Sequence, residues 1–110
     1  MIKIHIGMFG DSARFAIKGH AGYAESGKDI VCAGVSVLTN CLANMAQEFK
    51  ERGVTDDCVC IPEDSPTYIV IKSGDPAVKA AVETIADMYG QLALQYPEYI
   101  DLTIEQVVIR

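Results

Sequence analysis

The chain contains no tryptophan, and only 7% of its residues are aromatic. Aliphatic side chains must therefore fill its core. Half of the 110 residues are hydrophobic, which is enough for one core but not for two. The length and composition predict a single domain over residues 1–110. No repeat, linker or low-complexity segment divides the chain.

Basic residues are scarce. Nine Lys and Arg stand against fifteen Asp and Glu, and the formal net charge is −6 at pH 7. Binding to nucleic-acid phosphates requires clustered Lys and Arg, so we expect no direct binding of nucleic acid. The negative charge suits a basic protein or peptide partner, although many soluble proteins are acidic for solubility alone.

Long hydrophobic runs are also missing. Residues 1–9 alternate between apolar and polar side chains, unlike a signal peptide or a membrane span. No later stretch approaches eighteen consecutive apolar residues. We therefore expect a cytoplasmic protein with no membrane partner and with reduced cysteines.

The four cysteines lack the spacing of a complete metal site. Cys58 and Cys60 form a Cys-x-Cys pair, which can supply half of a zinc site, but no second Cys/His cluster accompanies them. Cys41 stands alone. We interpret these three cysteines as structural or incidental and expect no metal or other cofactor. A small thiol redox or metal protein is the weakest alternative.

The hydrophobic pattern alternates between two periods. A period of two predicts strands near residues 2–9, 14–18, 57–61, 68–72 and 100–109. A step of three and four predicts a helix over residues 30–52, with Asp29 as N-cap and Gly53 closing it, and a second helix that starts at Pro76 behind Asp75 and stops before Pro97.

This order of elements indicates the fold class. The sequence strand-strand-helix-strand-strand-helix-strand predicts an α+β fold with a mixed or antiparallel sheet that carries both helices. If both helices cover one face of the sheet, the other face is exposed unless a second copy of the chain covers it.

Cys32 is the candidate nucleophile. It falls in the first turn of the predicted long helix, where unpaired backbone N–H groups and the positive end of the helix dipole favour a thiolate. His20, the better of two candidate bases, precedes it by twelve residues at the end of a predicted strand. An imidazole there can accept the thiol proton. The alternative is a core cysteine and a loop histidine that never meet.

Two further polar residues support this pair. Asp29 can cap the helix, or it can hold the His20 imidazole in one tautomer, and the two roles do not exclude each other. Ser36 lies four residues after Cys32, on the same helix face, so we expect its hydroxyl within hydrogen-bond reach of the sulfur. His5 lies mid-strand on the polar face and is interpreted as a surface residue.

The loop between His20 and Cys32 is polar and rich in glycine. Gly22 and Gly27 bracket a segment in which we expect few apolar anchors. A loop with hinges beside a nucleophile can close on a substrate, although an ordinary surface connection has the same composition. We interpret it as a lid over residues 21–28.

A known family carries a similar motif. The residues are Gly19-His20-Ala21, followed after a short loop by Gly27-Lys28-Asp29-Ile30-Val31-Cys32-Ala33-Gly34-Val35-Ser36. This stretch resembles the signature of the ribosomal-processing cysteine proteases called Prp. Gly34 departs from it, because many relatives carry a second alanine there, and a helical glycine costs about 1 kcal/mol relative to alanine.

The resemblance implies a homodimeric cysteine endopeptidase with His20 and Cys32 as its catalytic pair. It also implies a substrate: the basic twenty-seventh protein of the large ribosomal subunit, whose N-terminal extension the family removes. A ribosome-associated binding module without enzymatic activity is the alternative, in which the motif only anchors the helix.

Overall fold

The chain forms seven elements in the predicted order. The computed structural model describes residues 1–25, 28–55, 57–61 and 67–107. The elements are β1 (Ile2–Phe9), β2 (Ser12–Lys18), α1 (Ile30–Glu51), β3 (Asp57–Ile61), β4 (Thr67–Lys72), α2 (Pro76–Gln95) and β5 (Ile100–Val107).

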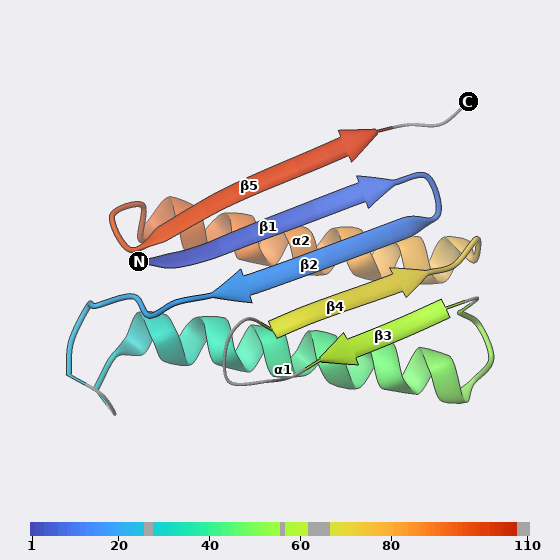
Figure 1. Cartoon of the computed structure of the whole chain (residues 1–110), viewed down its shortest axis with the longest axis horizontal. Helices are drawn as coiled ribbons and strands as arrows, with labels where there is room; N and C mark the ends of the chain where they lie inside the picture. The colour runs from blue at the N-terminus through green and yellow to red at the C-terminus, as the bar shows by residue number, and fades with distance from the viewer. Residues whose placement is uncertain (26–27, 56, 62–66, 108–110) are drawn as a thin grey trace.

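One sheet holds all five strands, in the order β3-β4-β2-β1-β5. Four strands pair antiparallel, and β5 pairs parallel to β1, so the sheet is mixed. Both helices lie on the same face of this sheet (Figure 1). The predicted α+β fold class is confirmed.

A two-residue turn joins β1 to β2. Phe9 pairs with Ser12, which leaves Gly10 and Asp11 as the central residues of the turn. Gly10 has a φ of 59°, and no residue other than glycine has a positive φ among the described residues. This pattern matches a type II′ turn, which needs glycine at its first central position and fits the twist of a hairpin.

The core lies between the sheet and the two helices. Inward residues of β1 and β2 meet the helices there, and Ile6, Phe15 and Tyr89 have no exposed surface. The predicted stripe of α1 is confirmed for four residues: Val31, Val35, Leu38 and Leu42 are buried. Met45 and Phe49 are only partly buried, because Ala46 occupies the buried position on that turn.

Capping residues define the helix starts. The Asp29 carboxylate accepts the backbone N–H of Cys32, and the Asp75 carboxylate accepts that of Ala77. Both predicted N-caps are confirmed. At its other end α1 stops at Glu51, one residue earlier than predicted, and Gly53 follows with a φ of 71°.

The helix α1 has the length and composition of a membrane span. In this fold, however, its apolar stripe packs against the sheet and α2, as described above. A long helix that buries one face in a core meets the same length and composition criteria, so this feature alone assigns no membrane role.

The outer face of the sheet is polar. His5 lies there, and its Nε2 atom is 3.3 Å from Oε1 of Glu105, with both side chains at least half exposed. A surface ion pair of this kind contributes little to stability. His5 therefore lies on the face opposite the helices, as expected for a surface residue.

We predict that Gly34→Ala stabilises the fold. A Cβ atom at this helical position would lie 3.6 Å from Cδ2 of Leu92, an ordinary van der Waals contact, and alanine is favoured over glycine in helices by about 0.5–1 kcal/mol. Urea unfolding should show a higher midpoint. The matched control is Gly53→Ala, which should lower it, because the φ of +71° strains any residue with a Cβ atom. A destabilised Gly34→Ala would contradict the prediction.

Candidate active site

A cavity of about 300 Å³ lies between α1 and the adjoining ends of β1, β2 and β4. Three residues that the sequence singles out line it, namely His20, Cys32 and Ser36. Thr39 and Asn40, from the next turn of α1, also line its wall. The tertiary structure thus brings the candidate base and the candidate nucleophile into one cavity.

Cys32 lies half-buried in the first turn of α1. Its Sγ atom accepts a hydrogen bond from the backbone N–H of Ala21, with 3.2 Å between nitrogen and sulfur. Both this donor and the positive end of the helix dipole stabilise negative charge on the sulfur. Cys32 therefore has the surroundings of a candidate nucleophile.

Close packing constrains the residues on both sides of His20. Gly19 has a φ of +94°, and a Cβ atom there would lie only 2.5 Å from the carbonyl oxygen of Met1. On the other side, Ala21 is buried, with 4% of its surface exposed. His20 itself is exposed on the cavity wall. Glycine at position 19 lets β2 end in a turn that carries the imidazole to the start of α1.

Asp29 joins the loop to the helix. One carboxylate oxygen accepts the N–H of Cys32 at 2.9 Å, and the other accepts the N–H of Tyr23 at 3.0 Å. The hydrogen bond from Cys32 is the main cause that lowers the pKa of this carboxyl below its usual 3.8, although desolvation opposes it. The cap role is thus confirmed. No hydrogen bond between Asp29 and His20 occurs among the described residues.

Ser36 lines the cavity, but the predicted hydrogen bond between its hydroxyl and the Cys32 sulfur is not among the described contacts of the sulfur. The sulfur is bonded instead by the Ala21 backbone N–H. The sequence analysis missed this donor, since a backbone group leaves no residue-specific signal. It also missed Thr39. For this residue a sequence signal did exist, because Thr39 lies seven residues after Cys32, about two helical turns along the same face.

Beneath the cavity, Thr39 is fixed by the core. Its hydroxyl donates to the carbonyl oxygen of Val35 and lies 2.8 Å from the hydroxyl of Tyr89. Since the threonine hydrogen goes to Val35, Tyr89 is the donor to Thr39. Burial raises the pKa of Tyr89 to about 12, which keeps this donor protonated. Hydrogen bonds from Tyr89 to Thr39 and from Thr39 to Val35 therefore connect the cavity wall to the core.

The loop after His20 has an aromatic anchor. The Tyr23 ring makes edge-to-face contacts with Tyr96 and Tyr99, at centroid distances of 5.9 and 5.1 Å. The expectation of few apolar anchors is wrong at this position, because two tyrosines distant in sequence supply them. Gly22 has a φ of +69°, and Gly27 lies outside the described residues. The lid over residues 21–28 stays a prediction. If it closes, the Tyr23 ring either leaves the rings of Tyr96 and Tyr99 or moves together with them.

The remaining cysteines lie elsewhere. Cys41 is exposed on α1, a little over two turns beyond Cys32. Cys58 and Cys60 belong to β3, and their side chains lie outside the described part of the structure. Within the described part, no group of three His, Cys, Asp or Glu residues is placed to hold a metal ion.

Known proteins share this arrangement of elements. The sequence profile of a family described as cysteine protease Prp matches residues 1–101. The chain belongs to the cysteine protease Prp family. Membership shows cysteine-type peptidase chemistry, in agreement with the resemblance of the motif around His20 and Cys32.

Solved structures agree with the Prp fold. The ribosomal processing protease Prp from S. aureus, in complex with a covalently linked product peptide, is 24% identical with a TM-score of 0.70. Its complex with a substrate peptide is 25% identical with a TM-score of 0.62. Each match covers 96% of this chain and all of the other. SMU.848 from Streptococcus mutans has a TM-score of 0.68 at 24% identity, over 97% and 96% of the two chains. No curated protein sequence shows significant similarity.

We predict that iodoacetamide at neutral pH alkylates Cys32 before Cys41. Cys41 is the more exposed thiol, so exposure alone would favour Cys41. The Ala21 N–H and the helix N-terminus favour Cys32 through its thiolate. Peptide mapping by mass spectrometry after short labelling separates the two effects, and Cys41→Ser is the control that removes the competing site. Earlier labelling of Cys41, Cys58 or Cys60 would contradict the prediction.

We predict that Asp29→Ala lowers the midpoint of thermal unfolding by roughly several degrees, because both hydrogen bonds of the carboxylate are lost. Asp29→Asn, which keeps an oxygen acceptor, should lose less stability.

The stabilisation by Asp29 should also depend on pH. Because folding lowers the pKa of Asp29, its contribution to the free energy of unfolding is complete above the ordinary value of 3.8. This contribution is lost as the pH falls through the lower pKa of the folded protein. Wild type and Asp29→Ala should therefore converge in stability in acid. A difference that persists there would contradict this assignment.

Proposed function

We propose that the protein is a cysteine endopeptidase with Cys32 as nucleophile and His20 as general base. The observation that carries this proposal is the shared cavity, which is lined both by His20 and by a cysteine at the start of a helix. Family membership supports the same assignment.

The reaction follows from the chemistry of these groups. The Cys32 thiol passes its proton to the His20 imidazole, and the sulfur attacks the carbonyl carbon of the scissile peptide bond. His20 then returns the proton to the departing amine, which leaves an acyl group on the sulfur. Water, deprotonated by His20, hydrolyses this thioester and releases the free acid and the thiol.

Backbone N–H groups near the start of α1 are the candidates for the oxyanion hole. Two of them are already engaged, because Cys32 donates to the Asp29 carboxylate and Ala33 donates to the Asp29 carbonyl. The Ala21 N–H points at Sγ in the free protein. Once the sulfur has attacked and lost its charge, this donor becomes available to the oxyanion that forms next to it.

The proposed substrate is the twenty-seventh protein of the large ribosomal subunit, cleaved at its N-terminal extension. The motif around His20 and Cys32 supports this choice through its resemblance to the family. A net charge of −6 suits a basic substrate. We further propose that the protein acts in the cytoplasm without binding nucleic acid directly.

We also propose that the protein is a homodimer, as the family resemblance implies. The structure offers apolar surface for this on the helix layer, where Val37 and Leu94 are 64% and 75% exposed. The open face of the sheet is less suited to it, because charged residues such as Lys3 and Arg14 are exposed there.

We predict that the purified protein cuts the extended ribosomal protein once, near the end of its N-terminal extension. Mass spectrometry of the products reads the cut directly. Cys32→Ala and His20→Ala should abolish it, because each removes one half of the proton transfer. Cys41→Ala is the matched control and should retain full activity, since Cys41 does not line the cavity. An uncut substrate that nevertheless binds the wild-type protein would favour a binding module.

A further inference from the structure

A second cavity lies at the opposite end of the sheet. It has a volume of about 170 Å³ and lies between the β1–β2 turn, the end of β4 and the first half of α2. Ile2 of β1 lines the first cavity and Met8 lines the second. Ile2 and Met8 are six residue steps apart on the strand, which is roughly 20 Å at a rise of about 3.3 Å per residue. The second cavity is therefore separate from the peptidase site.

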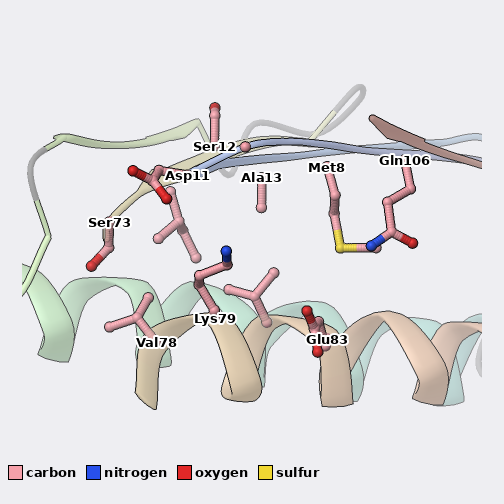
Figure 2. A pocket seen from close by; sticks show the side chains of 12 residues that line it. Met8, Asp11, Ser12, Ala13, Ser73, Val78, Lys79, Glu83 and Gln106 are labelled. Carbon is pink, nitrogen blue, oxygen red and sulfur yellow. The ribbon is translucent and has the colours of Figure 1, made fainter. Parts of the chain in front are cut away.

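The floor of this cavity is apolar. Met8 and Ala13 reach down from the sheet towards α2 (Figure 2), and Ile71, Val78 and Val82 also line the cavity. Ala13 and Val82 are buried. Engineered cavities of about 150 Å³ with apolar walls hold a molecule of the size of benzene. This floor therefore has room for a branched aliphatic side chain.

The rim carries charges of both signs. Lys79 rises from α2 towards the sheet, Asp11 lies at the β1–β2 turn, and Glu83 lies one turn further along α2 (Figure 2). Within the described part of the chain, the ion pairs are His5–Glu105 and Glu48–Arg52, so Lys79 forms none with Asp11 or Glu83. A Lys four residues before a Glu is the weaker order for a helical ion pair. The charges are thus open to a ligand.

The rim is also fixed in position. The Asp11 carbonyl oxygen accepts the backbone N–H of Ser73 at 2.9 Å, which ties the β1–β2 turn to the segment before α2. The Ser73 hydroxyl donates to the Val54 carbonyl and accepts the N–H of Asp75, so its hydrogen bonds are used within the protein. The distance between the turn and α2 is therefore set before any ligand enters.

We propose that this cavity binds a small zwitterion with an aliphatic side chain, that is, a free apolar amino acid. The ligand carboxylate pairs with Lys79, its ammonium pairs with Asp11 or Glu83, and its side chain enters the apolar floor. Lys79 offers a partner to a carboxylate, and Asp11 and Glu83 offer partners to an ammonium group, so a zwitterion can pair both of its charges at this rim. Gln106, whose side chain also points into the cavity (Figure 2), can hydrogen-bond either end.

The test is a titration of Cys32→Ala, the full-length chain without its nucleophile, so that its result does not depend on proteolysis. L-leucine should shift the backbone amide resonances of Ala13 and Val82 saturably, with a dissociation constant on the order of 0.1–1 mM. Leucinamide, which lacks the carboxylate, and 4-methylpentanoate, which lacks the ammonium, should each bind about tenfold more weakly. L-serine, which lacks the apolar side chain, should also bind more weakly.

Variants separate the contributions. Lys79→Met should weaken the binding of leucine about tenfold or more, and so should at least one of Asp11→Asn and Glu83→Gln. Ala13→Val keeps the charges and fills the floor, so it should also weaken binding. Lys3→Met, an exposed change on the other face of the sheet, is the control and should bind as before. Leucinamide binding as tightly as leucine would identify a site for plain cations, and that result or the absence of any shift would overturn the proposal.

Discussion

The two hydrogen bonds of the Asp29 carboxylate hold the candidate active site together. One bond starts α1 at the N–H of Cys32, and the other fixes the N–H of Tyr23 in the preceding loop. A single carboxylate therefore helps to fix both the helix start at Cys32, the candidate nucleophile, and the chain that follows His20, the candidate base. Because Ala21 lies two residues before Tyr23, this path also brings the Ala21 N–H to the sulfur.

Two distant parts of the chain support this site. The carbonyl of Met1 leaves no room for a side chain at Gly19, which makes β2 turn away beside His20. The rings of Tyr96 and Tyr99, after α2, contact Tyr23. The chain before His20 and the first part of the loop are thus held by contacts with distant residues, whereas the residues that follow Tyr23 are mostly polar.

Each end of the sheet lines a different cavity. At one end, the termini of β1 and β2 and the start of α1 enclose the cavity that His20 and Cys32 line. At the other end, the β1–β2 turn and α2 enclose a smaller cavity with mixed charges. The same strands line both, because inward residues at either end of a strand point to the helix layer. Two chemically distinct cavities can therefore share one core.

Sequence patterns that extend over only a few residues determined much of the secondary structure of this protein. The period-two strands, the stripe of α1 and the Asp29 cap depend on neighbours within a few residues, so the sequence predicts the order of elements and places Cys32 in a first turn. The motif around His20 also indicates the family. Contacts between distant segments were decided only by the tertiary structure: the shared cavity of His20 and Cys32, the Ala21 N–H on the sulfur and the aromatic anchor of Tyr23. Backbone donors and ring contacts between distant residues leave no periodic signal, because they depend on how the packed elements meet.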